Sequence, residues 1–237
     1  MQKELTLVEH LGELRGRIII CLAALGVSSI ASFPFASVLL WILKLPADGL
    51  IKKLVFFSPQ EAFNIHMQVA VLCGWFISMP VILYQLWAFI SPAIIEERAR
   101  RYIAFFVSFG FITFFGGGLF AYFVLIPPAL KFLLSFGGPE LEPVISAQKY
   151  IAFLATIILG CGMVFQMPVL SLILTKLRII NARILRSKYK YAIVIIFIAA
   201  AVITPTTDIM NMMLLAGPMV FLYEISIWIS FLASKRR

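Results

Sequence analysis

The stretch KYIAFLATIILGCGMVFQMPVLSLILT, residues 149–175, indicates the fold class, because it is apolar over most of its length and carries no charge after Lys149. An α-helix needs only about 20 such residues to cross the ~30 Å hydrocarbon core of a bilayer. The rest of the chain has the same character: 62% of its 237 residues are hydrophobic, 13% are charged, and the mean hydropathy is +1.02. This composition excludes an ordinary soluble domain.

Apolar runs recur along the chain and predict six membrane spans. Helices are expected because a segment in lipid must satisfy its own backbone hydrogen bonds, and the runs lack the alternating pattern of barrel strands. We therefore predict an all-α, polytopic membrane protein that forms a single domain over residues 1–237. The expected spans are roughly 17–43, 62–90, 102–134, 149–175, 190–204 and 209–233.

The basic residues divide unevenly between the two sides of these spans. Fifteen of the 20 Lys and Arg residues lie before the first span, in the 91–101 and 176–190 connections, or at the C-terminus. The other five lie at or near the opposite ends of the spans. By the positive-inside rule, both termini are predicted to be cytoplasmic, which agrees with an even number of spans. The net charge of +9 is therefore interpreted as a topology signal, and no nucleic-acid partner is expected.

Two spans have unusual features. The fifth, from Tyr191 to Thr204, covers only ~21 Å at ~1.5 Å per residue, so it predicts local thinning of the bilayer or shelter behind neighbouring helices, unless its boundary is misplaced. The third contains Gly116-Gly117-Gly118, which predicts either close packing against another helix or a bend.

The chain shows no catalytic apparatus. Its three cysteines lie in apolar stretches and are interpreted as packing residues, and its histidines are His10 and His66 only. No metalloprotease, serine-hydrolase or nucleotide-binding motif is present. We expect no enzyme activity, metal site or cofactor. The acidic N-terminus is also unlike a cleavable signal peptide, so the first span is expected to remain in the mature protein.

The N-terminal segment predicts a helix that leads into the first span. Leu7, Leu11, Leu14 and Ile18 define one apolar face, and Glu13 and Arg17 lie on the opposite face at a spacing of four residues. This spacing favours an ion pair on a solvated helix.

Two motifs stand out in order along the chain: residues 10–15, His-Leu-Gly-Glu-Leu-Arg, followed by Arg17, and the long apolar motif of residues 79–92, which begins Met-Pro-Val-Ile-Leu-Tyr-Gln. The first resembles the HLxELRxR opening of the TatC family, the receptor subunits of the twin-arginine protein translocase, and the second is similar to that family's PVILYQxWxFIxP signature. Shorter similarities lie at residues 58–63, 120–123, 165–168, 204–208 and 223–225, so the resemblance covers nearly the whole chain.

The resemblance implies a six-helix, cup-shaped membrane protein of the prokaryotic inner membrane with both termini in the cytoplasm. It implies binding of the twin-arginine signal peptides of folded cargo, and assembly with single-span TatA- and TatB-type subunits into an oligomeric complex driven by the proton-motive force. The expected signal-peptide residues are Glu13 and a carboxylate in the loop after the second span, together with Arg15, Arg17 and Phe89. Carboxylates suit this role because they accept the planar guanidinium fork in bidentate fashion.

The chain departs from the family pattern at two positions. Where the family usually has the loop glutamate, the chain has Arg98, so the role either moves to Glu97, with Glu96 as the neighbouring alternative, or the site is built differently. In the fourth span, Gln166 replaces a glutamate. We expect Gln166 and Glu224 to form a polar patch sheltered from lipid, because a charged side chain costs ~2.5–3.5 kcal/mol at a helix centre.

The resemblance also implies structural residues on the outer face, with the 44–60 and 135–148 loops forming an outer cap. The expected residues are Glu61, Pro80, Pro205 and Asp208. A small-molecule or ion transporter is the alternative function, motivated by Glu224 and Gln166, although the chain lacks the paired broken spans of many transporters.

Overall fold

The computed structural model describes residues 7–51, 53–90, 99–137, 143–177, 179–204 and 208–235. Within these ranges it has five helical segments that are long and apolar enough to cross a membrane, and one shorter apolar helix. The long segments are Leu11–Ala47, Pro59–Ile90, Ile103–Ser135, Ala147–Lys176 and Ile209–Ser234, and the shorter helix is Tyr189–Ile203. The six apolar helical segments predicted from sequence are therefore confirmed, with boundaries shifted by a few residues.

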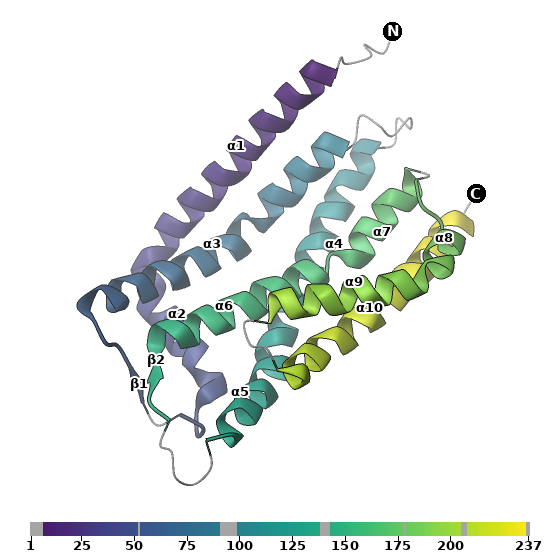
Figure 1. Ribbon diagram of the computed structural model, residues 1–237. Helices are drawn as coiled ribbons and strands as arrows, with labels where there is room; N and C mark the ends of the chain where they lie inside the picture. The colour runs from purple at the N-terminus through teal and green to yellow at the C-terminus, as the bar shows by residue number, and fades with distance from the viewer. Residues whose placement is uncertain are drawn as a thin grey trace.

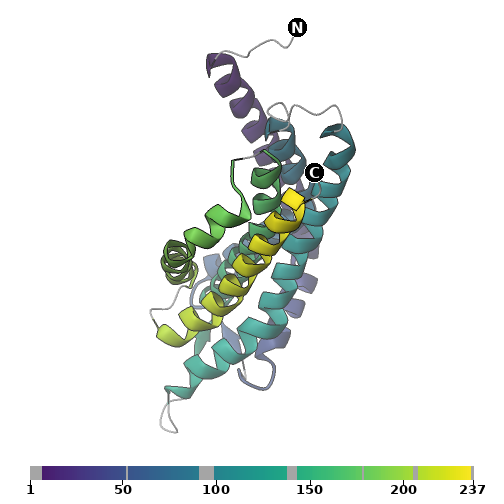
Figure 2. The same ribbon diagram turned by 90° about the vertical axis from the view of Figure 1, so that its right-hand side faces the viewer.

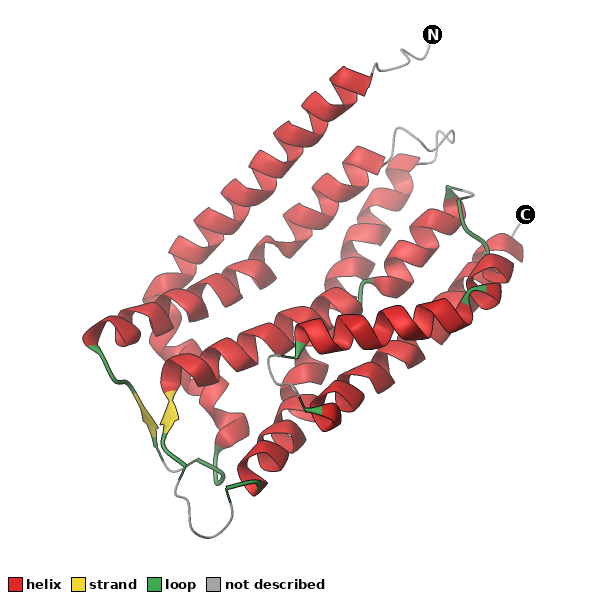
Figure 3. Ribbon diagram, in the orientation of Figure 1, coloured by secondary structure: helices red, strands yellow, loops and turns green. Residues whose placement is uncertain are grey.

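Several of these segments contain more than one helix, as Figures 1 and 3 show. Prolines account for much of this division, because a proline ring removes a backbone donor and disturbs the preceding turn. The first segment, for example, is divided by a 3₁₀ turn that contains Pro34. In chain order the elements are α1 Leu7–Ser32, η1 Phe33–Phe35, α2 Ala36–Lys44, η2 Leu45–Ala47, β1 Leu54–Val55, α3 Pro59–Ile90, α4 Ala99–Phe120, the π-helical turn η4 Ala121–Leu125, α5 Ile126–Ser135, β2 Ile145–Ser146, α6 Ala147–Val164, α7 Met167–Lys176, α8 Ala182–Ser187, α9 Tyr189–Ile203 and α10 Ile209–Lys235.

The helices form a row in which α1 packs against α3, α3 packs against α4 and α6, and α10 packs against α7 and α9. Both ends of the chain lie at the same end of the molecule (Figures 1 and 2). The opposite end carries a short parallel pairing of β1 with β2, in which Leu54 lies beside Ile145. The main core lies around α6, whose Ile151 and Leu154 are fully buried.

Two tyrosine side chains form hydrogen bonds with the end of α2, next to this strand pair. The Tyr122 hydroxyl donates to the Ile42 carbonyl at 2.6 Å, and the Tyr150 hydroxyl donates to the Leu43 carbonyl at 2.8 Å. The Ile42 carbonyl also accepts from the Leu45 backbone N–H, so the Tyr122 hydroxyl adds a second hydrogen bond there. The Tyr150 hydroxyl reaches a carbonyl in the last turn of α2, where helix carbonyls lack partners further along the helix. The contacts join the first, third and fourth apolar segments at the end of the molecule that carries β1 and β2.

The short fifth segment is confirmed as short, so its predicted boundary was not misplaced. Helix α9 has 15 residues, which cover ~22 Å. Its far end lies on α6, where the gap is so small that a Cβ atom on Gly160 would come within 2.3 Å of Ile203 Cγ2. Figure 1 shows that α9 ends well short of the end of the molecule where the strands lie.

Two of the three consecutive glycines of α4, Gly117 and Gly118, pack closely against other helices. A Cβ atom on Gly117 would lie 2.9 Å from the Cys161 carbonyl oxygen of α6, and one on Gly118 would lie 2.6 Å from the Phe76 ring of α3. Gly116, in contrast, faces open space. Because the π-helical turn η4 follows directly, the segment combines close packing with a local change of helical winding.

Candidate functional site

The predicted Glu13–Arg17 ion pair is present, and its arginine also contacts a second helix. Arg17 Nε donates to Glu13 Oε1 at 3.0 Å, and Arg17 Nη2 contacts the same oxygen. The same guanidinium donates to Gln85 Oε1 at 3.0 Å and to the Ala88 carbonyl at 3.1 Å, both on α3. Arg17 therefore joins the carboxylate of α1 to the last turns of α3.

The orientation of α1 differs from the amphipathic expectation. Leu11 is 64% exposed and Ile18 is 49% exposed, whereas Leu14 is half-buried, so two of the three described residues of the predicted apolar face are turned away from the protein. The face with Glu13 and Arg17 lies against α3 instead, with side-chain exposures of 28% and 22%. This arrangement is suited to a membrane, because lipid can cover the apolar face while α3 satisfies the guanidinium.

Gln85 is a site residue that the sequence analysis did not single out. Its side chain is half-buried and accepts a hydrogen bond from Arg17. The available signal was its position, since it is a polar residue within the otherwise apolar segment of α3 that resembles the family signature. Next to the site, Trp87 is buried and stacks on Phe106 of α4 with ring centroids 4.2 Å apart.

The other predicted binding residues are arranged around this contact or lie outside the described residues. Arg15 is exposed on α1, and Phe89 is half-buried near the end of α3. Glu96 and Glu97 fall outside the described ranges. Their described neighbours, Ile90 and Ala99, lie at the same end of the molecule as the N-terminal part of α1, which projects beyond α3 (Figures 1 and 2).

Gln166 is buried between the fourth and third apolar segments. Its side-chain nitrogen donates to the Gly110 carbonyl at 2.9 Å and lies 3.2 Å from the Thr113 hydroxyl. Its side-chain oxygen is buried and has no hydrogen-bond partner among the described residues. The Gln166 side chain is thus buried against α4, and its membership of one polar patch with Glu224 stays a prediction.

Glu224 lines a different space. It is half-buried on α10 and faces a cavity of about 680 Å³ that also exposes Arg183 and Arg186 of α8. Helices α7 and α10 run in the same direction, because Ser171 bonds the Ser226 carbonyl at 3.0 Å and Thr175 bonds Ser230 at 2.8 Å. This register places Gln166 and Glu224 at similar depths along the two helices. Gln166, however, contacts α4, whereas Glu224 faces α8.

Two of the four outer-face residues predicted from sequence, Glu61 and Asp208, have helix-end contacts. Glu61, in the first turn of α3, accepts a hydrogen bond from the Phe57 backbone nitrogen at 3.0 Å. Asp208 accepts from the backbone nitrogen of Asn211 at 2.7 Å, the geometry of a residue that caps the start of α10. Pro80 does not lie at a helix end as an outer-face residue would. It lies inside α3, ten residues before Ile90, and the helix continues through it. Pro205 lies outside the described residues.

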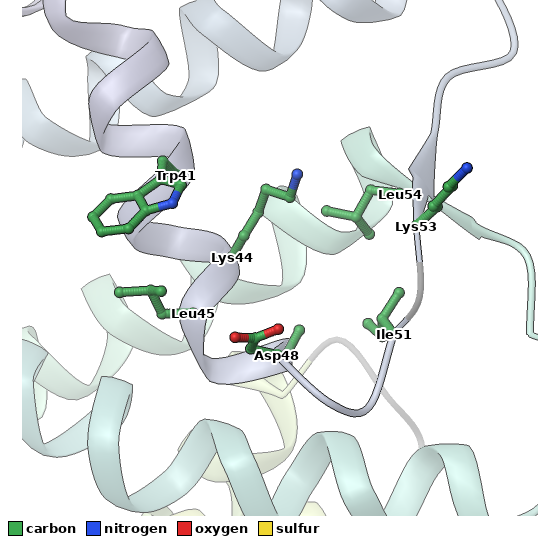
Figure 4. Close-up of a pocket in the computed structure, with 8 residues that line it drawn as sticks. Trp41, Lys44, Leu45, Asp48, Ile51, Lys53 and Leu54 are labelled. Atoms are coloured by element: carbon green, nitrogen blue, oxygen red, sulfur yellow. The ribbon is translucent and has the colours of Figure 1, made fainter.

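A small hollow lies at the strand end of the molecule, between the end of α2 and the 51–54 segment. In Figure 4, Ile51 and Leu54 point into it from one side, with Lys44 on the other, whereas the Lys53 ammonium points away. It belongs to the predicted outer cap and lies far from Glu13 along the first apolar segment.

Comparisons with known proteins give one consistent result. The family model described as "Sec-independent protein translocase protein (TatC)" matches residues 9–218. The chain is 38% identical to the TatC of Carboxydothermus hydrogenoformans over 96% of this chain and 93% of that protein, and 38% identical to the TatC of Aquifex aeolicus over 98% and 97%. A chloroplast TATC from Pisum sativum is 33% identical over 98% of this chain and 66% of that protein.

The structure agrees with the sequence comparisons. It is similar to a crystal structure of the twin-arginine translocase receptor TatC, with a TM-score of 0.85, 37% identity and coverage of 96% of this chain and 100% of that one. Both comparisons extend across the α1–α3 contact as well as the hydrophobic core. The chain belongs to the TatC family of Sec-independent protein translocase proteins.

Proposed function

We propose that this chain is the receptor and scaffold subunit of a twin-arginine translocase, and that it binds the paired arginines of a signal peptide at the end of the molecule that carries Glu13. Export of folded cargo would be driven by the proton-motive force. The family assignment favours this role over the small-molecule transporter considered from sequence.

The observation that carries the proposal is the partly exposed carboxylate of Glu13 in contact with a guanidinium. Arg17 holds the carboxylate in place from one side and is itself anchored on α3 by Gln85 and Ala88. An incoming arginine offers the same planar donor fork as Arg17. It can therefore share or take over the carboxylate while Arg17 keeps its contacts with α3.

Electrostatics supports local recognition over general attraction. The chain has a net charge of +9, so a cationic peptide is repelled by the protein as a whole. Carboxylates placed at the binding position overcome this repulsion locally and fix the register of the peptide. We assign the second carboxylate to Glu97, with Glu96 as the neighbouring alternative, and include Arg15 and Phe89 in the binding surface.

The remaining parts of the proposal concern the setting of this receptor. We propose that the chain is a single membrane domain in the cytoplasmic membrane of a prokaryote, with both termini in the cytoplasm. Its partners are single-span TatA- and TatB-type subunits in an oligomeric complex. It has no catalytic activity of its own, in keeping with a family of translocase components.

The test is titration of a labelled twin-arginine signal peptide onto the detergent-purified protein. Replacing both peptide arginines by lysine keeps the charge but removes the fork, so we expect affinity to fall by about tenfold or more. Glu13→Ala and Glu97→Ala should each weaken binding of the arginine peptide.

Two carboxylates outside the proposed binding residues are the controls. Glu4→Ala and Glu61→Ala remove the same charge and should leave the affinity unchanged. Equal affinity for the two peptides, or an unchanged affinity after Glu13→Ala, would contradict the assignment. If Glu96→Ala weakens binding and Glu97→Ala does not, the second carboxylate is Glu96 and the role of Glu13 is unchanged.

A further inference from the structure

The groove between α8 and α10 has charges that the receptor role does not use. One wall is a face of α10 that carries Glu224, Trp228 and Phe231, and the other is α8 with Arg183 and Arg186. Its volume of about 680 Å³ is within the ~300–1,000 Å³ typical of small-molecule sites. No hydrogen bond or ion pair joins Glu224 or either arginine to another described residue.

The groove lies alongside the membrane-spanning part of α10. The Tyr223 hydroxyl donates to the Leu185 carbonyl at 2.8 Å, which holds α8 at the level of Glu224. Lys235, the last residue of α10, is eleven residues further on, or ~16 Å along the axis. Two arginines are thus held beside a helix that would otherwise be surrounded by acyl chains, at a cost unless a partner satisfies them.

The pattern of charges and apolar surface specifies the occupant. The two guanidinium groups are suited to a phosphate, which they bind with directional hydrogen bonds. The carboxylate of Glu224 is suited to a cation on the same molecule. Trp228 and Phe231, which are 64% and 47% exposed, provide an apolar wall of the kind that lies at membrane interfaces.

We propose that this groove binds the headgroup of a zwitterionic phospholipid with a primary ammonium, phosphatidylethanolamine, from the leaflet on the side of the two chain termini. The phosphate lies between Arg183 and Arg186, the ammonium donates to Glu224, and an acyl chain lies along Trp228 and Phe231. This site is independent of signal-peptide binding at Glu13.

Other lipids match the groove less completely. An anionic headgroup such as phosphatidylglycerol satisfies the arginines but leaves the carboxylate of Glu224 without a cation. Phosphatidylcholine carries a cation, but its quaternary ammonium has no N–H to donate to that carboxylate. The proposal therefore predicts a preference among lipids in addition to binding.

The experiment is native mass spectrometry of the detergent-purified protein titrated separately with dioleoyl phosphatidylethanolamine, phosphatidylcholine and phosphatidylglycerol. We expect the wild type to bind the ethanolamine lipid about fivefold or more tightly than the other two. Glu224→Gln should abolish this preference. The double change Arg183→Gln with Arg186→Gln should lower the affinity for all three lipids by about tenfold.

Lys190→Gln is the matched control, because Lys190 lies in the same basic segment but does not line the groove. It should bind lipids as the wild type does. Arg186→Lys keeps the charge with little risk to folding and should retain most of the preference. The proposal is overturned if Glu224→Gln keeps the wild-type preference, if phosphatidylglycerol binds most tightly, or if the arginine pair behaves like Lys190→Gln.

Discussion

At the scale of single residues, Arg17 decides how the N-terminal helix meets the rest of the protein. Its guanidinium contacts a carboxylate on its own helix and two oxygen acceptors on α3. A planar group with five donors can serve all three acceptors at once, whereas an ammonium is a compact point charge. Arg15, only two residues away, is exposed on the same helix.

The first prediction compares these two arginines. Arg17→Gln should lower the free energy of unfolding by about 1–2 kcal/mol, because it removes charge-assisted hydrogen bonds that join α1 to α3. Arg15→Gln removes the same charge from an exposed position and should change stability by less than about 0.5 kcal/mol. Thermal unfolding of the two variants in detergent measures the difference, and equal Tm values would contradict the joining role of Arg17.

At the scale of elements, α1 depends on α3 for its place in the fold. The two helices are in close contact at Gly74, where a Cβ atom would lie 2.3 Å from Ser29 Oγ and 2.9 Å from the Ser29 backbone nitrogen. Small residues allow helices in a membrane to pack with their backbones in close contact, where dispersion forces are effective. The packing therefore requires the absence of a side chain at this position.

The second prediction concerns Gly74→Ala. In an isolated helix this change is stabilising, but here the new methyl meets backbone atoms of α1, so we expect a loss of about 1–3 kcal/mol. Gly16→Ala is the control, since nothing lies within 4 Å of a Cβ atom there and the change should be neutral or stabilising. The measurement is the Tm in detergent, and two variants that shift Tm in the same direction would refute the close-contact explanation.

The short helix α9 gives the third prediction. Val194 and Val202 are 57% and 78% exposed on this helix, and its far end rests on Gly160 of α6. A bilayer thinned around this end would admit water near Val202 but not near Val194. In a background with the three native cysteines replaced by alanine, Val202→Cys should react about tenfold faster than Val194→Cys with an impermeant maleimide. Equal protection of both would show that the bilayer keeps its full thickness there.

At the scale of the whole molecule, the start of α1, helix α8 and the end of α10 lie at one end (Figure 1), and most of the basic residues lie in the parts of the sequence in or next to these helices or in the 91–101 connection. The opposite end carries β1, β2 and the hollow beside Lys44. Such a charge difference orients membrane proteins with the basic end in the cytoplasm. The arrangement also places Glu13 and the proposed lipid groove on the same side of the membrane.

The fourth prediction tests this orientation with reporter fusions. Fusions at the C-terminus and in the 91–101 or 176–190 connections should report a cytoplasmic location. Fusions in the 44–60 or 135–148 loops should report the opposite side, because these two loops together hold three basic residues, whereas the 91–101 and 176–190 connections together hold nine. A C-terminal reporter active outside the cytoplasm would overturn the six-span topology.

The sequence by itself determined the fold class, the six apolar segments and the family, because the length of an apolar run and the spacing of a motif are local properties. It also predicted the Glu13–Arg17 pair, since residues four apart lie on one helix face. It placed Gln166 away from lipid, because an amide in hydrocarbon needs partners.

Only the tertiary structure decided which elements these residues meet. The contacts of Arg17 with Gln85 and Ala88 join positions 68 and 71 residues apart, and those of Gln166 with Gly110 and Thr113 span 56 and 53. The direction in which the apolar face of α1 points was likewise undetermined, because lipid and protein core are equally apolar and a helical pattern cannot distinguish them. The groove that brings Glu224 beside Arg183 and Arg186 exists only because the chain turns back after α7 and lays α8 along α10.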